Sequence, residues 1–532
     1  MTSPLFAQAQ ALHQRNQFRE AEQAYRQVLA AEPGNALAWH WLAILYYQQQ
    51  RGGDALMAVD TALKIAPEAP DALMLKGALL QASGRAREAR DAIASATNLK
   101  PGNGEGWYNL GLIESELKNL DAAVAAFDRA LALAPGAWPA VFARGEALLE
   151  LGRHEEAIAA FDRLLAHDPS LVDVWNNKGT ALWRLKRLAE AAAIYDKVVA
   201  LAPGTARFWI YRFAVLFAMK RCDEAIASLD KALALEPGND EALLARGQAL
   251  CEAGRIEEGL AVFAARGARL HGGRDSSAPD DVAHKQRHDI EQRAYLAGQG
   301  IAHGKYHLEP GARVAGHAVN PNAAAQVQWD RSNPKLVVLD DFLSPAALEG
   351  LRRYCWGSTV WQRAYADGYL GAMPKSGFGC PLLAQIAEEL RSRFPDIFAG
   401  HSLGHMWGFK YDSSLSGINV HADEAAVNVN FWITSDEANL DPDHGGLVVW
   451  DVMAPLDWNA EQYNGDVPAT RKFLADIGAK SQTVPYRANR AVIFDSDLFH
   501  ETDVLTFKPG YENRRINITM LFGRRIAPES GT

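Results

Sequence analysis

The stretch that decides the fold of the first half is residues 138–171, WPAVFARGEALLELGRHEEAIAAFDRLLAHDPSL. It holds two apolar helical patterns, separated by a short turn at Gly152 and Arg153. Pro169 ends the second helix, because proline cannot continue a helix and disfavours the helical conformation of the residue before it. One such hairpin cannot bury its apolar face alone, so this stretch predicts that similar hairpins stack against it.

The hairpin recurs every 34 residues along the chain. Its proline is found at Pro33, Pro67, Pro101, Pro135, Pro169, Pro203 and Pro237. A small residue keeps the same spacing at Gly77, Gly111, Gly145, Gly179 and Gly247, and a large aromatic residue lies at Tyr25, Phe127, Phe161, Tyr195 and Phe263. We expect the small residue to let two helices approach closely and the ring to fill the remaining gap. The pattern predicts an all-α solenoid of about eight hairpins over residues 1–266.

This pattern resembles the tetratricopeptide repeat, which has the same period, about 34 residues. The resemblance implies a superhelix with a concave groove that takes extended or helical segments of protein partners. Asn109 and Asn177 match positions that often face this groove in the family, although ordinary surface amides would fit the same pattern. The tryptophans near the start of the first helices are expected to pack in the core: Trp39, Trp41, Trp107, Trp138, Trp175 and Trp209.

The composition argues against several classes of function. The 532 residues carry a net charge of -10, whereas a nucleic-acid-binding protein needs a basic surface. No apolar run approaches the ~18–20 residues of a membrane span, and the N-terminus lacks the basic and apolar regions of a secretory signal. The four cysteines form no CxxC pair, so neither a disulfide framework nor a zinc knuckle is indicated. We expect a cytoplasmic protein with no nucleic-acid or membrane partner, and the sequence leaves its oligomeric state open.

The repeat pattern stops near residue 266. Residues 267–333 are polar and rich in Gly, Ser, Pro and Asp over part of their length, which is typical of a linker. Within them, residues 285–300, KQRHDIEQRAYLAGQG, predict one further helix. We interpret this helix as a cap on the end of the repeat array.

Residues 334–532 lack the repeat pattern and contain short β-type segments instead. They begin with a β-type run, KLVVLDDFL, followed by a helix for which Ser344 is a plausible N-cap, and then by the amphipathic helix PLLAQIAEELRSRF. The β-type segments that follow are short: HMWGFKYD, INVHAD, AVNVNFWIT, GGLVVWDV, RAVIFDS and RINITMLFG. Short strands separated by Gly, Asp, Asn and Pro clusters predict an antiparallel β-sandwich or jelly roll.

A candidate metal site lies in this second half. His421 and Asp423 form an HxD triplet, and residues i and i+2 of a strand point to the same face. His500 supplies a possible third ligand. Two histidines and one carboxylate form a facial triad that leaves sites open on Fe(II) for a bidentate cosubstrate and O2. A zinc hydrolase would use similar ligands but leave one main open site.

The strand that follows His500 predicts an anion site. Strand alternation puts Arg515, Asn517 and Thr519 on one face and apolar residues on the other. An arginine at the mouth of such a polar face can clamp a carboxylate with two hydrogen bonds. Arg514 is the main rival, because a slip of one residue exchanges the two faces. Fe(II) ligands with a carboxylate clamp suggest 2-oxoglutarate.

Residues 335–524 resemble a 2-oxoglutarate/Fe(II)-dependent dioxygenase of the prolyl-hydroxylase-like branch. The matching features are His421 and Asp423, the strand that starts at Gly445 and Gly446, His500, and Arg515-Ile-Asn-Ile-Thr519. The resemblance implies a double-stranded β-helix (jelly roll) with flanking helices. It implies that His421, Asp423 and His500 are the catalytic metal ligands, that Arg515 anchors 2-oxoglutarate, and that Tyr411, Asn430 and Thr519 line the cosubstrate pocket. An extra segment, about residues 455–481, departs from the family pattern and contains a predicted helix at ATRKFLADIG.

The sequence thus predicts a multidomain oxygenase. Fe(II), 2-oxoglutarate and O2 would hydroxylate a C–H bond of a protein or peptide substrate recruited by the repeat groove. One alternative is a hydroxylase of a small metabolite that uses the repeats for assembly. Another is a repeat scaffold whose second domain is degenerate or only senses 2-oxoglutarate.

Overall fold

The computed structural model describes residues 4–272, 282–301, 306–324, 329, 336–398, 400–412 and 417–525. The chain divides into two compact units, Met1–Val215 and Leu216–Thr532. None of the helices in the described ranges is long and apolar enough to cross a membrane.

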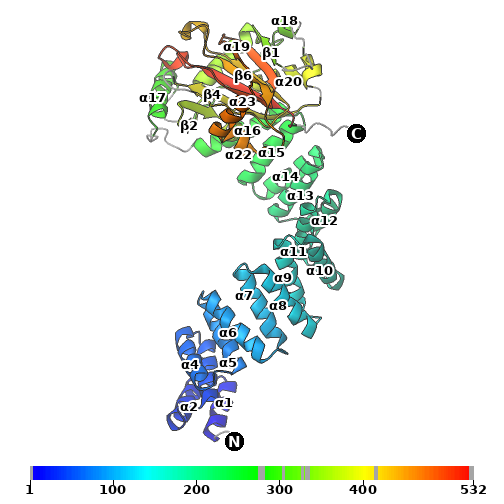
Figure 1. The fold of residues 1–532 in the computed structure, drawn as a ribbon, viewed down its shortest axis with the longest axis vertical. Helices are drawn as coiled ribbons and strands as arrows, with labels where there is room; N and C mark the ends of the chain where they lie inside the picture. Colours follow the sequence, from blue (N-terminus) through cyan, green and yellow to red (C-terminus); the bar gives the residue numbers. More distant parts are fainter. Residues whose placement is uncertain are drawn as a thin grey trace. The chain divides into compact units, whose positions relative to one another are not determined.

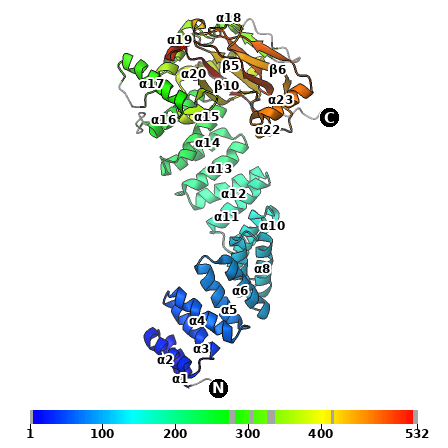
Figure 2. The same ribbon diagram turned by 60° about the vertical axis from the view of Figure 1, so that its left-hand side comes forward.

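The first half of the chain folds into helical hairpins that follow one another along the sequence, as Figures 1 and 2 show within each unit. Within residues 4–272 the helices are α1 (Pro4–Gln14), α2 (Phe18–Ala31), α3 (Ala36–Gln48), α4 (Gly52–Ile65), α5 (Pro70–Ala82), α6 (Ala86–Leu99), α7 (Gly104–Glu116), α8 (Leu120–Leu133), α9 (Trp138–Glu150), α10 (His154–His167), α11 (Val172–Arg184), α12 (Leu188–Leu201), α13 (Ala206–Ala218), α14 (Cys222–Leu235), α15 (Asp240–Glu252) and α16 (Ile256–His271). They pair into eight hairpins, as the repeat period predicted.

The small residue and the aromatic residue of the repeat pattern contact each other inside several hairpins. A Cβ atom on Gly145 would lie 2.6 Å from the ring of Phe161, and one on Gly111 would lie 2.5 Å from the ring of Phe127. Both rings are fully buried. The prediction that the ring fills the space left by the small residue is therefore confirmed at these hairpins.

Gly145→Leu is expected to destabilise the array by about 1–3 kcal/mol, because a larger side chain would overpack against Phe161. The measurement is urea unfolding of the full chain, followed by far-UV circular dichroism. Gly136→Leu is the matched control, since a Cβ atom at Gly136 meets nothing within 4 Å. Equal losses in the two variants would contradict the packing role of the glycine register.

Several tryptophans of the first helices donate a hydrogen bond in addition to packing against apolar side chains. The indole Nε1–H groups of Trp107 and Trp175 each donate to the carbonyl of the proline six positions earlier, at 2.9 Å. Trp39 and Trp209 make the same hydrogen bond. These residues are only partly buried, so the expectation of plain core packing is incomplete. The hydrogen bond ties the start of one hairpin to the end of the preceding one.

The second unit contains two antiparallel sheets. Its strands are β1 (Leu336–Leu339), β2 (Arg363–Tyr365), β3 (Tyr369–Ala372), β4 (Leu403–Tyr411), β5 (Val427–Trp432), β6 (Leu447–Met453), β7 (Ser481–Val484), β8 (Ala491–Asp495), β9 (Leu498–Thr502) and β10 (Ile516–Phe522). The seven-stranded sheet has the order β1-β8-β5-β10-β4-β3-β2, and the three-stranded sheet has the order β7-β6-β9. Every strand pair in the described ranges is antiparallel.

Helices and short 3-10 turns surround these sheets. They are α17 (Ala283–Gly298), α18 (Pro321–Ala324), α19 (Pro345–Gly357), α20 (Pro381–Arg393), α21 (Pro395–Phe398), α22 (Ala460–Asn464), α23 (Val467–Asp476), η1 (Pro374–Ser376), η2 (Asp436–Ala438) and η3 (Tyr511–Asn513). Ser344 caps α19 as predicted, since its side chain accepts a hydrogen bond from the Ala347 N–H.

The last hairpin of the array shares a core with the sheets. Ile256, Leu260 and Phe263 of α16 are buried in one apolar cluster with residues of α19, α20 and β10. Helix α16 also packs on η1 and α20, and α15 packs on β4. The boundary placed at residue 266 therefore does not separate two cores, because the apolar face of α16 is completed by the sheet domain.

The predicted helix in the linker forms as α17, but it does not cap the array. It packs on α19 and η3. Gln292 donates to the hydroxyl of Tyr511, and Arg287 forms an ion pair of 2.8 Å with Asp412. Helix α17 therefore belongs to the surface of the sheet domain. The rest of the predicted linker lies partly outside the described residues.

Candidate functional site

The two candidate histidines face each other across a single β-bridge. The N–H of His421 donates to the carbonyl of His500 at 3.0 Å, and the N–H of His500 donates to the carbonyl of His421 at 2.8 Å. His500 lies in β9, but the segment around His421 is not a strand beyond this one bridge. The predicted strand INVHAD is therefore wrong. Other backbone contacts hold the segment, among them the hydrogen bond from the Ala422 N–H to the Tyr463 carbonyl in α22.

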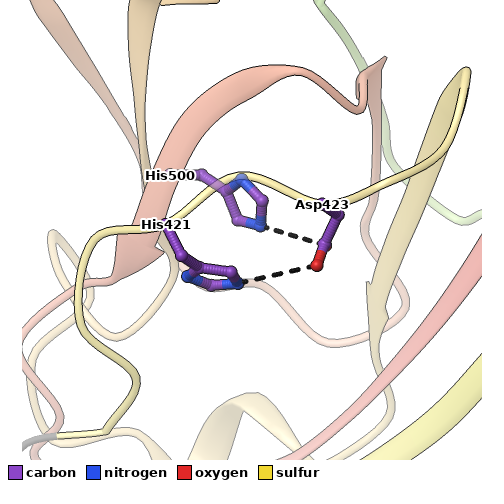
Figure 3. A group of neighbouring side chains, drawn as sticks. All are labelled: His421, Asp423 and His500. Carbon is purple, nitrogen blue, oxygen red and sulfur yellow. Dashed lines mark ion pairs between the residues drawn. The ribbon is translucent and has the colours of Figure 1, made fainter. Parts of the chain in front are cut away.

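The three predicted metal ligands come together. One donor atom from each of His421, Asp423 and His500 lies within 4.8 Å of the others. The Asp423 carboxylate is 4.0 Å from Nε2 of His421 and 3.5 Å from Nε2 of His500. Figure 3 shows both imidazole rings turned toward this carboxylate. Bond lengths of about 2.0–2.2 Å between a divalent metal and such donors fit this spacing.

Backbone hydrogen bonds fix which nitrogen of each ring faces the site. Nδ1 of His421 lies 2.8 Å from the carbonyl of Asn419, and Nδ1 of His500 lies 2.9 Å from the carbonyl of Leu498. A carbonyl can only accept, so each Nδ1 carries the proton and each Nε2 directs a lone pair at the site. This arrangement orients histidine ligands in metal centres.

Burial sets the protonation of the same groups. It is the largest influence on His421 and, with the neighbouring His500, lowers the pKa of His421 to about 4. Burial by itself raises the pKa of Asp423, but the two neighbouring histidines outweigh it and lower that pKa. Asn428 donates a further hydrogen bond of 2.9 Å to Asp423. At neutral pH the site thus offers a neutral imidazole at His421 and a carboxylate, which suit a divalent first-row metal ion.

Arg515 lies in the same cavity as the three ligands. The cavity is small, with a volume of about 20 Å³. The guanidinium is buried, and its Nη2 donates to the carbonyl of Gly446 at 3.1 Å, while Nε and Nη1 have no hydrogen-bond partner among the described residues. Burial lowers the pKa of Arg515, but an arginine keeps its charge in a protein. A buried cation with two unused N–H groups calls for an anionic ligand.

Arg514 does not enter the cavity. Its Nε is 2.8 Å from Glu291 of α17, and its Nη1 is 3.4 Å from Asp412. The apolar residues of β10, by contrast, lie in the core cluster, as strand alternation predicted. The structure thus has the register in which Arg515, not Arg514, faces the cavity.

The other predicted pocket residues also line this cavity. Tyr411 contributes its hydroxyl, 3.3 Å from the Thr502 hydroxyl, and its ring centre lies 4.7 Å from the Arg515 guanidinium carbon. Asn430 and Thr519 lie opposite each other on β5 and β10 and share a hydrogen bond of 3.3 Å. Asn517 lines the cavity too, and its side-chain oxygen Oδ1 is buried without a hydrogen-bond partner among the described residues.

Two contributors were not assigned from the sequence. Trp407 lines the cavity from β4, and Asn428 holds the Asp423 carboxylate. The alternation of Asn428 and Asn430 on β5 was a usable signal that both amides face inward. Nothing in the local sequence distinguishes Trp407 from a core tryptophan.

Gly446 lets β6 approach its neighbour closely. A Cβ atom there would overlap the carbonyl oxygen of Val484. Gly446→Ala is therefore expected to destabilise the second unit by about 1–3 kcal/mol through overpacking. Thermal unfolding monitored by tryptophan fluorescence measures the loss. Gly404→Ala is the control, because the nearest atom to a Cβ there is 3.7 Å away; a similar loss in both variants would refute the steric argument.

Comparisons with known proteins identify the helical half. One tetratricopeptide repeat profile matches residues 74–137 and 142–206, and a second matches residues 12–79 and 216–272. The hairpins are tetratricopeptide repeats. The second match includes the whole of α15 and α16, so the repeat that completes the sheet-domain core is a member of the array by sequence.

Curated relatives match over a limited length. Protein O-mannosyl-transferase TMTC1 of Homo sapiens is 29% identical over 133 residues, which are 24% of this chain and 15% of the relative. A BBSome complex member BBS4 homolog of Drosophila melanogaster is 28% identical over 132 residues, 25% of this chain and 27% of the relative. The match thus spans well under a third of either relative.

Solved structures with similarity to the chain include a tetratricopeptide repeat protein from Parabacteroides merdae, with 18% identity and a TM-score of 0.32, covering 46% of this chain and 97% of that one. The C-terminal part of a repeat-containing protein from Cytophaga hutchinsonii has 18% identity and a TM-score of 0.39, covering 45% of this chain and 98% of that one.

Proposed function

We propose that the second unit is a 2-oxoglutarate/Fe(II)-dependent oxygenase with a double-stranded β-helix core. The observation that carries the proposal is the combination of His421, Asp423 and His500 in one cavity with a buried Arg515, whose Nε and Nη1 lack a hydrogen-bond partner among the described residues. A metal triad alone is compatible with several chemistries. The added cation restricts the ligand to one that carries an anionic group away from the metal.

The two functional groups of 2-oxoglutarate match the two groups of residues in this cavity chemically. Its keto acid end is a bidentate chelator that suits the sites left open by a facial triad. Its second carboxylate can accept a charge-assisted hydrogen bond from Nε or Nη1 of Arg515, which lack a partner among the described residues. The two antiparallel sheets support the proposal of a jelly roll.

The protein residues have separate roles in this proposal. His421, Asp423 and His500 would hold Fe(II), which supplies the activation of O2 when bound. Arg515 binds and orients the distal carboxylate. The rings of Tyr411 and Trp432, at 4.7 and 5.4 Å from the Arg515 guanidinium carbon, exclude water from that ion pair and so strengthen it.

The balanced reaction is conversion of 2-oxoglutarate, O2 and a substrate C–H group to succinate, CO2 and a C–OH group. We propose that the substrate is a protein or peptide, because tetratricopeptide repeats generally bind such partners. Tethering the array to the oxygenase raises the effective concentration of a captured chain near the cavity. A small-metabolite hydroxylase and a scaffold that only senses 2-oxoglutarate are the two competing proposals.

The test is succinate formation from 2-oxoglutarate by the full chain with Fe(II) in air, compared with Asp423→Ala. Slow succinate formation without any substrate, absent in the variant, is expected. Binding of 2-oxoglutarate without any succinate would favour the sensing scaffold. Absence of both would refute the oxygenase proposal.

A further inference from the structure

A groove lies beside the proposed catalytic cavity, within the second unit. Its walls are Leu244 and Cys251 of α15, Phe263 of α16, Met373 next to η1, and Leu403 and Trp407 of β4. Its volume is about 390 Å³, against about 20 Å³ for the catalytic cavity. Its lining is predominantly apolar, so it suits an uncharged side chain.

The groove and the cavity share a wall. Trp407 lines both. It belongs to the same strand as Tyr411, which contacts Arg515 inside the cavity. A ligand in the groove therefore lies next to the side chains that surround the metal site.

The same groove runs along an unpaired strand edge. On one side β4 pairs with β10 along nearly its whole length. On the other side β3 pairs with it only from Gly408 to Tyr411, and then the chain turns away at Met373 and Pro374. Within the described residues, Leu403–Trp407 has no strand partner on that side. The backbone N–H and C=O groups of every second residue there point to that side, where an added strand could pair with them.

We infer that an extended segment of a substrate polypeptide binds in this groove, pairs with β4 at Leu403–Trp407 and places an apolar side chain against the residues of α15 and α16 that line it. The inference rests on the proposed function, because it describes how a peptide reaches that site. An extended peptide is favoured over a helical one, because the strand edge offers backbone groups that a helix, whose own backbone groups are already paired, cannot use.

The test uses binding rather than turnover, so that its failure is distinct from failure of the oxygenase chemistry. An immobilised set of random heptapeptides is incubated with the full chain and Mn(II), without 2-oxoglutarate. We expect enrichment of peptides that share an apolar residue. Single N-methylation along an enriched peptide should weaken binding at alternate positions, because only every second amide of a strand points toward its partner.

Gln248→Trp tests the location. Gln248 is exposed on α15 and lines the groove, so a tryptophan there should fill it and weaken peptide binding at least tenfold. Lys231→Trp, on the exposed surface of α14, is the matched control and should bind as the unaltered chain does. Thermal unfolding of both variants checks that they are folded.

Three results would overturn the inference. They are the absence of any enriched peptide, equal binding by Gln248→Trp and the unaltered chain, and an N-methylation profile without alternation. The last result alone would indicate a peptide bound in another conformation.

Discussion

Asp423→Ala is expected to abolish metal binding and turnover while leaving the helical repeats folded. The carboxylate faces both imidazole Nε2 atoms, so its loss removes the anionic ligand and leaves the two histidines. Repeat stability depends mainly on contacts between neighbouring hairpins, so the array should keep its helical signal. Metal content after dialysis against Fe(II) without oxygen, together with succinate formation, measures the effect.

His421→Ala should give the same result, and His444→Ala is the matched control. His444 lies outside the cavity lining, where its Nδ1 is 3.1 Å from Asp503. If His421→Ala kept full metal content and turnover, the assignment of the three ligands would be wrong.

Arg515→Ala is expected to raise the KM for 2-oxoglutarate by about 30-fold to several thousandfold. This range corresponds to about 2–5 kcal/mol, the usual loss when a buried charge pair loses one partner. Initial rates of succinate formation over a range of 2-oxoglutarate concentrations give the value. Arg515→Lys should restore only part of the affinity, because a lysine cannot form the paired hydrogen bonds of a guanidinium.

Arg514→Ala serves as the comparison. Its ion pairs with Glu291 and Asp412 connect the strand to α17, so we expect a loss of stability with little change in KM. Arg287 still pairs with Asp412 in this variant, which limits that loss. A larger KM effect at Arg514 than at Arg515 would show that Arg514 is the carboxylate anchor.

The repeats could be predicted from the sequence because their signal is local and recurs. Gly145 and Phe161 lie in consecutive helices of one hairpin, and the same pair returns one period later as Gly179 and Tyr195. The end of the array could not be predicted in this way. Leu260 of α16 follows the same apolar pattern as its counterparts, and no local property shows that its neighbour is a sheet instead of another hairpin.

The residues of the candidate site could be predicted where their side chains have few possible chemical roles. His421, Asp423 and His500 are metal-ligand types, and strand alternation placed Arg515 on the polar face of β10. The conformation at His421 was not predictable, because a contact distant in sequence, from Ala422 to Tyr463 in the inserted helices, shapes that segment.

The insertion that departs from the expected pattern supports the metal segment. Val420, Ala422 and Phe499, which neighbour the ligands in sequence, are buried in one cluster with Tyr463 of α22 and Leu474 of α23. The insertion therefore belongs to the structure around the proposed metal centre, and its removal would disturb the ligands without removing any of them.

The shared core of the last hairpin determines where the chain can be recombined. Hairpins before Val215 can be added, deleted or exchanged in steps of one whole repeat, because each contacts mainly its immediate neighbours. A chain that started after residue 333 would instead expose the apolar surface that Ile256 and Leu260 cover. Duplication of repeats can thus alter which partners are captured while the proposed chemistry is retained, and chimeric chains should be joined ahead of α13.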